Sequence, residues 1–172
     1  MAWNEAAYHG LMFNIVCRKP TLWVKWIGTY KIKSKGFWTM TIPNDVSWVW
    51  RAILKTREPA RKNIKYLIAN GKDIDIWEDP WSNLGPLKLN PQVVSSWCPT
   101  IPQAPLDSII TSRSVNASLI SLLPGVEAEV LSQVSVLTQL NKDRLSWTPN
   151  SAGTFTTRNA YQAMMQDSEK VK

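Results

Sequence analysis

The sequence is poor in the residues that build metal sites, disulfide scaffolds and many catalytic centres. Its 172 residues include one histidine, His9, and two cysteines, Cys17 and Cys98. Two widely separated cysteines exclude a disulfide framework and a cysteine-cluster zinc finger, because structural zinc needs about four clustered ligands. We therefore expect no metal and no cofactor, and we expect His9 on a helix face and both cysteines as packing residues.

Recognisable catalytic motifs are missing as well. The chain has no glycine-rich phosphate loop, no Gly-x-Ser-x-Gly elbow and no His-Glu-x-x-His. An acidic group at positions 73, 75, 78 and 79 has the composition of a magnesium site, but Asp73 and Asp75 share a predicted strand face with Trp77 and no histidine is close in sequence. Solvated charges are the better interpretation, so the sequence predicts no catalytic residue and no enzyme activity of the chain by itself.

Long hydrophobic runs are also absent. No apolar run approaches the ~20 residues that a membrane span needs, and the first residues lack the basic and apolar regions of a secretory leader. We therefore expect a nuclear or cytoplasmic protein that is neither secreted nor inserted in a membrane. With 44% hydrophobic and 19% charged residues, the composition is typical of a globular chain rather than a disordered tail.

What the chain does have is an uneven distribution of positive charge and tryptophan. Residues 1–75 hold 13 basic and 5 acidic side chains, whereas residues 76–172 hold 7 and 8. Nine of the ten tryptophans lie at or before Trp97. This asymmetry predicts a basic, aromatic N-terminal half joined to a more ordinary C-terminal half.

Hydrophobic periodicity predicts an α-rich α+β fold with a helical N-terminal half. Residues 2–17 are apolar nearly all round a helix, as buried helices are. Thr21 is placed to cap a second helix, and Asp45 is placed to cap a third that ends or kinks at Pro59. The expected core stripe of the second helix is Trp23, Trp26, Ile27 and Tyr30. The expected core stripe of the third is Val46, Val49, Trp50, Ile53 and Leu54.

The remainder of the chain has turn and strand signals. The Asn70-Gly71 pair, between apolar segments 64–69 and 73–77, predicts a β-hairpin with a type I′ turn. Six prolines at positions 80–105 predict a stretch without a helix or a central strand. The expected division of the chain is a basic tryptophan-rich region 1–81, a proline-rich connector 82–105 and a C-terminal part 106–172.

The C-terminal part is predicted to be small and mixed. Short helical turns are expected at 106–110, 117–123 and 126–131. A second hairpin, formed by residues 144–148 and 153–155, is expected to precede a closing helix that Thr156 or Thr157 caps.

Basic side chains interleaved with tryptophans form the candidate binding surface. Lysine and arginine neutralise phosphates, and exposed aromatic rings stack on unpaired bases. The best candidate is Trp48 beside Arg51 and Lys55, at i, i+3 and i+7 on the face of the third helix opposite its core stripe, whereas we expect most other tryptophans in the core. The candidate nucleic-acid-binding residues are Lys25, Lys31, Lys33, Lys35, Trp48, Arg51, Lys55, Arg57, Arg61, Lys62 and Lys65.

An ordered series of strings resembles a known family. The first strings are Trp-Asn-Glu-Ala-Ala at 3–7, Leu-Trp-Val-Lys-Trp-Ile at 22–27 and Phe-Trp at 37–38. They are followed by Ser-Trp-Val-Trp-Arg-Ala-Ile-Leu-Lys at 47–55, Asn-Gly-Lys-Asp-Ile-Asp-Ile-Trp-Glu-Asp-Pro-Trp at 70–81 and Leu-Gly-Pro-Leu at 84–87. In this order they resemble the region that follows the polymerase domain in plant LINE-type (non-LTR) retrotransposon reverse transcriptases, which are RNA-directed DNA polymerases.

The second half continues the resemblance. Asp-Arg-Leu-Ser-Trp at 143–147 and Gly-Thr-Phe-Thr-Thr-Arg-Asn-Ala-Tyr at 153–161 are similar to the opening of the reverse-transcriptase zinc-binding domain. The family's Tyr/Phe-Ala-Asp-Asp polymerase signature has no counterpart, and the zinc ligands would follow Tyr161 but do not occur. The resemblance thus implies a truncated, non-catalytic piece, with no catalytic or metal residue to carry over.

Three functions follow as expectations. The first is weak, non-specific binding of RNA or DNA through the basic N-terminal half of a reverse-transcriptase fragment. The alternative is a protein-interaction module that docks a partner through the exposed aromatic surface of residues 1–30, with its apolar N-terminal helix. An active reverse transcriptase would require a second chain that supplies the missing Asp-Asp element.

Overall fold

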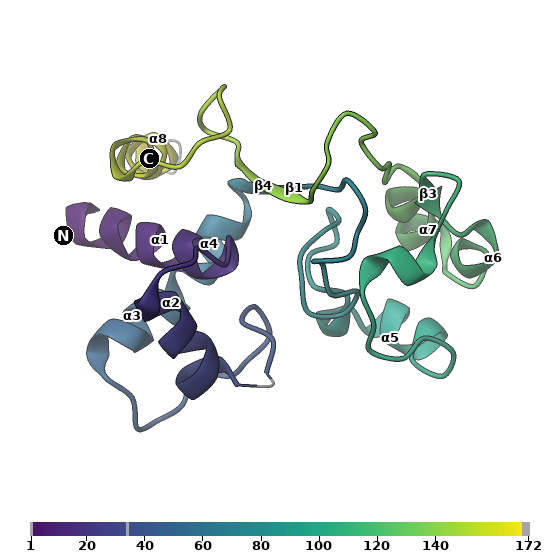
Figure 1. Ribbon diagram of the computed structural model, residues 1–172, viewed down its shortest axis with the longest axis horizontal. Coiled ribbons are helices and arrows are strands. Elements are labelled where there is room, and N and C mark those ends of the chain that lie inside the picture. Colours follow the sequence, from purple (N-terminus) through teal and green to yellow (C-terminus); the bar gives the residue numbers. More distant parts are fainter. Residues whose placement is uncertain (1, 34, 170–172) are drawn as a thin grey trace. The chain divides into compact units, whose positions relative to one another are not determined.

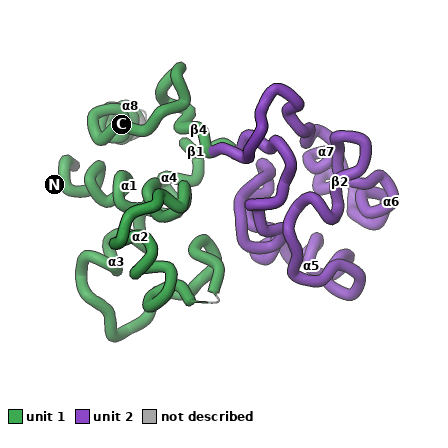
Figure 2. Tube along the Cα trace, in the orientation of Figure 1, with its two compact units in different colours: residues 1–65, 145–172 green, residues 66–144 purple. Residues whose placement is uncertain are grey.

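The computed structural model describes residues 2–33 and 35–169 of the chain. Helix makes up 45% and strand 9%, which confirms the predicted α-rich α+β class. The chain forms two compact units: unit 1 comprises residues 1–65 and 145–172, and unit 2 comprises residues 66–144 (Figure 2). These boundaries differ from the expected division at residues 81 and 105, because an N-terminal and a C-terminal segment fold together in unit 1.

The first helix, α1 (Ala2–Val16), lies inside unit 1 and confirms the helix predicted there. It packs against the last helix, α8 (Thr157–Glu169), and against α3 (Trp48–Lys55) (Figure 1). Phe13 belongs to the core cluster on the α8 side, and Met12 belongs to the cluster on the α3 side. Packing on both sides explains why α1 is apolar nearly all round. The expected docking of a partner through this helix is therefore not supported by its position.

The second helix, α2 (Leu22–Trp26), begins at the predicted cap, where Thr21 Oγ1 accepts a hydrogen bond from Val24 N at 3.2 Å. It continues as a π-helix, η1 (Ile27–Ile32). Val24 and Ile27 are its buried side chains, and these two aliphatic residues fill the space against the core. The predicted stripe is wrong for its aromatic members, which lie on the exposed side: Trp23, Trp26 and Tyr30.

The third helix, α3, begins later than predicted. Its cap is Ser47, whose Oγ accepts a hydrogen bond from Trp50 N at 3.3 Å, whereas Asp45 lies outside the helix. The helix ends at Lys55, four residues before Pro59, and the break at Thr56 agrees with the predicted end or kink, because Pro59 has no N–H for the Lys55 carbonyl. Pro59 itself lies near the start of the next helix, α4 (Arg57–Arg61). The predicted core stripe holds for Trp50, Ile53 and Leu54.

The predicted hairpin at Asn70-Gly71 is wrong. The first strand, β1 (Ile64–Leu67), pairs instead with β4 (Arg144–Trp147), which is far away in the sequence. The segment 69–73 wraps around the carboxylate of Asp143, which accepts hydrogen bonds from four of its backbone N–H groups at 2.7–3.3 Å. A distant carboxylate thus satisfies the donors that a local strand partner was expected to take.

The expected helix-free connector is also wrong, and its segment contributes Leu87, Val93, Trp97 and Ile101 to the core of unit 2. The helix α5 (Pro91–Trp97) runs through it. Pro91 occupies the first helical position, where its missing N–H costs nothing. Asn90 caps the helix by accepting hydrogen bonds from the N–H groups of Gln92 and Val93 at 3.0 and 3.1 Å.

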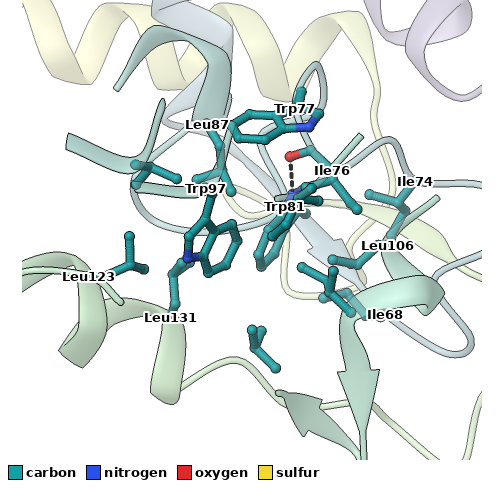
Figure 3. Close-up of a cluster of buried hydrophobic side chains, with 14 residues drawn as sticks. Ile68, Ile74, Ile76, Trp77, Trp81, Leu87, Trp97, Leu106, Leu123 and Leu131 are labelled. Carbon is teal, nitrogen blue, oxygen red and sulfur yellow. Dashed lines mark hydrogen bonds between the residues drawn. The ribbon is translucent and has the colours of Figure 1, made fainter. Parts of the chain in front are cut away.

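Indole rings organise this core (Figure 3). The Nε1 of Trp81 donates to Ile76 O at 2.8 Å, and the Nε1 of Trp97 donates to Leu119 O at 2.9 Å. Each ring therefore packs apolar surface while its one polar atom is satisfied. A short 3₁₀-helix, η2 (Leu87–Leu89), adds a fully buried leucine.

The other elements of unit 2 are short. The predicted helical turns are present as η3 (Leu106–Ile109), α6 (Ala117–Ile120) and α7 (Gly125–Ser132). The sequence did not predict the small antiparallel pair of β2 (Ile110–Thr111) and β3 (Ser114–Val115).

The C-terminal segment returns to unit 1. Because β4 pairs with β1, the predicted hairpin of residues 144–148 with 153–155 is wrong as a strand pair, although Trp147 N donates to Gly153 O at 2.9 Å. Thr156 Oγ1 accepts a hydrogen bond from Asn159 N at 3.1 Å and caps α8, as predicted.

Candidate nucleic-acid interface

Positive charge is concentrated in unit 1, as it is in the N-terminal half of the sequence. The residues of unit 1 include 15 basic and 5 acidic side chains, whereas those of unit 2 include 5 and 8. All eleven candidate binding residues belong to unit 1. The fold therefore gathers the candidates into one compact body.

The strip of Trp48, Arg51 and Lys55 on α3, the α3 strip hereafter, lies on the side opposite the core. Trp48 is 71% exposed and Lys55 is exposed, while Arg51 is half-buried and donates from Nη2 to Asn44 O at 2.7 Å. Tyr8 of α1 meets the Trp48 ring edge-on, with centroids 6.2 Å apart. This contact supports the ring on one side while most of its surface faces solvent, as a stacking platform requires.

A second exposed aromatic group lies on α2 and η1, within the aromatic segment 1–30 that was expected to dock a protein but outside the predicted nucleic-acid candidates. Trp26 is 47% and Tyr30 is 61% exposed, and their ring centroids are 5.7 Å apart. The Nζ of Lys31 lies 5.6 Å from the centroid of the Trp26 ring. Helical periodicity placed both rings in the core, and the basic residues that follow them are the sequence signal that favours an exposed site instead.

Most of the other candidate lysines are exposed, as the prediction of a basic surface requires: Lys25, Lys33, Lys35, Lys62 and Lys65. Arg61 forms an ion pair with Glu58 of the same helix at 3.1 Å. Surface pairs of this kind contribute about 0–1 kcal/mol, so Arg61 can exchange Glu58 for a phosphate at small cost.

Arg57 is a correction to the predicted surface. Its side chain is buried, and its guanidinium donates to the carbonyl oxygens of Leu54, Phe37 and Met40 at 2.7–2.8 Å. Burial lowers the pKa of Arg57 from its ordinary value. The side chain thus holds the loop at residues 37–40 against the end of α3, and it is not available to a phosphate.

The histidine and the two cysteines are the next residues to consider, because their side chains often take part in catalysis. His9 lies on a face of α1, as predicted, and is buried there; its Nδ1 donates to Glu5 O at 2.8 Å, and burial lowers its pKa. Burial likewise raises the pKa of the Cys17 thiol to about 11, which keeps it protonated. Cys98, predicted as a packing thiol, is exposed.

The acidic group of unit 2 is also structural, although it is less solvated than predicted. Asp75 Oδ1 accepts hydrogen bonds from Trp77 N and Glu78 N, both at 2.9 Å. Glu78 is buried and pairs with Lys88. Among the described residues, no group of three or more histidine, cysteine, aspartate or glutamate side chains is arranged to hold a metal ion.

Comparisons with known proteins add no assignment to this geometry. A scan against protein-family models found no match, and searches of curated proteins and of solved structures found none either. The resemblance to LINE-type reverse transcriptases therefore stays a prediction that rests on the ordered strings. Within residues 2–33 and 35–169, no helix has the length and apolar character to cross a bilayer.

Proposed function

We propose that this chain derives from a LINE-type reverse transcriptase and binds RNA or DNA weakly and without sequence preference through unit 1, with no catalysis of its own. The separation of charge carries the proposal, because unit 1 holds 15 basic and 5 acidic residues and unit 2 holds 5 and 8. Basic side chains gain affinity by releasing the counterions that surround phosphates, and this gain requires no base sequence. Because the proposed partner is RNA or DNA, we expect the chain in the nucleus or the cytoplasm.

The α3 strip supports the proposal in chemical detail. Trp48 offers an aromatic face at 71% exposure, and Arg51 and Lys55 follow it on the same side of the helix. A base can stack on the ring while the two cations meet flanking phosphates. Stacking of this kind accepts every base, which agrees with binding that lacks sequence preference.

A charge-removal experiment tests the proposal. The double variant Arg51→Gln/Lys55→Gln removes two cations from unit 1, and Lys72→Gln/Lys142→Gln removes two exposed cations from unit 2. For labelled single-stranded RNA, the slope of log affinity against log salt should become shallower by about 1.4 in the first variant, since each phosphate contact contributes about 0.7. It should change little in the second. Equal changes in both would contradict binding through unit 1.

The origin has a separate test in the genomic DNA beside the coding sequence. An adjoining stretch that encodes the Asp-Asp polymerase signature, in frame or frameshifted, supports derivation from a reverse transcriptase. Its absence favours the alternative function of a protein-interaction module.

The exposed rings of α2 and η1 are the observation that favours this alternative. Exposed apolar patches on soluble proteins often mark interaction sites. A monomer that binds no hydrophobic dye would count against a protein partner, whereas self-association or dye binding that the variant Trp26→Ala/Tyr30→Ala removes would support one.

A further inference from the structure

The strongest unassigned feature lies on η1, where the helix changes from α to π geometry. The backbone hydrogen bond from Lys33 N to Gly28 O, 2.8 Å long, spans five residues instead of four. Lys33 then leaves the helix at φ +56°, a conformation that residues other than glycine rarely adopt. Both π-turns and such strained positions occur preferentially at functional sites.

The π-turn has a direct effect on the side chains. In an α-helix, residues five apart point to different sides, because one turn takes 3.6 residues. The wider turn brings residue 31 back above residue 26, and Lys31 Nζ lies 5.6 Å from the Trp26 ring centroid. Tyr30 lies beside the same ring at 5.7 Å with the planes inclined by 32°. Two exposed rings and one cation thus meet on one side of η1.

The chain segment that carries these rings has charge of one sign only. Residues 6–44 contain six basic side chains and no acidic one. Three of these basic side chains are exposed and lie within a few residues of the rings in the sequence: Lys25, Lys33 and Lys35. A segment with exposed aromatic rings and only basic charged residues complements a polyanion that carries flat, apolar groups.

We propose that Trp26 and Tyr30 form a stacking site for the unpaired bases of a single-stranded nucleic acid, with Lys31 and its neighbouring lysines on the backbone phosphates. The proposal rests on the nucleic-acid binding proposed above and names the strand type and the site. The cation–π contact of Lys31 is weak at an exposed position, so the ammonium can move from the ring to a phosphate when a base stacks. In a duplex the base faces are stacked on one another and not accessible, so its binding free energy contains only the electrostatic contribution of the phosphates.

Fluorescence anisotropy with a labelled single-stranded RNA and with the same strand in a duplex tests the proposal. Each lost ring should weaken single-strand binding about tenfold, so Trp26→Ala/Tyr30→Ala loses about 100-fold, with little change for the duplex. Leu22→Ala is the matched control, because Leu22 is 87% exposed on α2, the helix that carries Trp26, but has no ring. Trp26→Phe/Tyr30→Phe keeps both rings and should retain most of the single-strand affinity.

The outcomes separate this proposal from the one on which it rests. If the wild type binds single strands with a salt-dependent affinity and the double alanine variant binds equally well, the stacking site is wrong and unit 1 still binds nucleic acid. Equal losses for strand and duplex, or failure of the phenylalanine variant to restore binding, would also overturn it. If the wild type binds neither ligand, both proposals are wrong, and the exposed rings then favour the alternative function of binding a protein.

Discussion

Asp143 illustrates how one side chain fixes a backbone segment that its local sequence does not determine. Its Oδ1 accepts hydrogen bonds from the N–H groups of Ala69, Asn70 and Gly71, and its Oδ2 accepts one from Asp73. Partial burial raises the pKa of Asp143, but these four donors outweigh burial and hold its pKa below the ordinary value of 3.8. The ionised form is therefore the one that stabilises the fold.

We expect Asp143→Ala to lower the free energy of unfolding by about 1–2 kcal/mol at pH 7, because several partly exposed donors lose a charged acceptor. Since the pKa is lower in the folded state, this contribution is complete above about pH 4 and disappears as the pH falls through the folded-state pKa. Urea denaturation of wild type and variant at several pH values measures it.

Lys142→Ala provides the control for this change. Lys142 lies next to Asp143 and forms an exposed ion pair with Asp73 at 3.6 Å, which is worth about 0–1 kcal/mol. A loss as large as that of Asp143→Ala, or a loss of equal size at pH 2 and pH 7, would contradict the role given to the Asp143 carboxylate.

Single elements were predictable from the sequence where local rules decide them. The helices α1, α2 and α8 lie where periodicity and threonine caps placed them, because each depends on residues close in sequence. The Asn70-Gly71 hairpin was not predictable, because its backbone donors bind a carboxylate from the far end of unit 2. The helix α5 was not predicted because proline was taken to interrupt helices, whereas Pro91 occupies the first position of this one, where proline is favourable.

The candidate site shows the same limit. The sequence indicated that the basic residues belong together, since charge is visible in composition. It gave no means to see that Arg57 is buried against three carbonyls or that Trp26 is exposed, because both depend on which residues fill the core beneath them. A π-turn is likewise a consequence of packing that periodicity does not reveal.

The start of α3 provides a test at the level of one helix. Ser47→Ala should cost about 1 kcal/mol of stability, because the side chain of Ser47 accepts from a first-turn N–H that otherwise has no partner. Asp45→Ala should change stability by less than about 0.5 kcal/mol, as surface substitutions usually do. Thermal denaturation distinguishes the two, and a larger loss for Asp45→Ala would restore the cap that the sequence predicted.

At the scale of the whole molecule, charge and fold divide the chain in the same way. Unit 1, built from residues 1–65 and 145–172, holds the excess of basic residues, the α3 strip and the exposed rings of α2 and η1. Unit 2 has more acidic than basic residues and keeps its tryptophans in its core. This division supports a binding role for unit 1. The helix α8 completes unit 1 by packing against α1.

The salt dependence of single-stranded RNA binding by the wild-type chain tests this account most directly. With three to seven phosphate contacts, the slope of log affinity against log salt should lie between about −2 and −5 for a single strand. A single-stranded RNA of a different sequence should give nearly the same slope and affinity, because the proposed binding has no sequence preference. A slope near zero, or no measurable binding at low salt, would contradict the proposal that unit 1 is a nucleic-acid-binding surface.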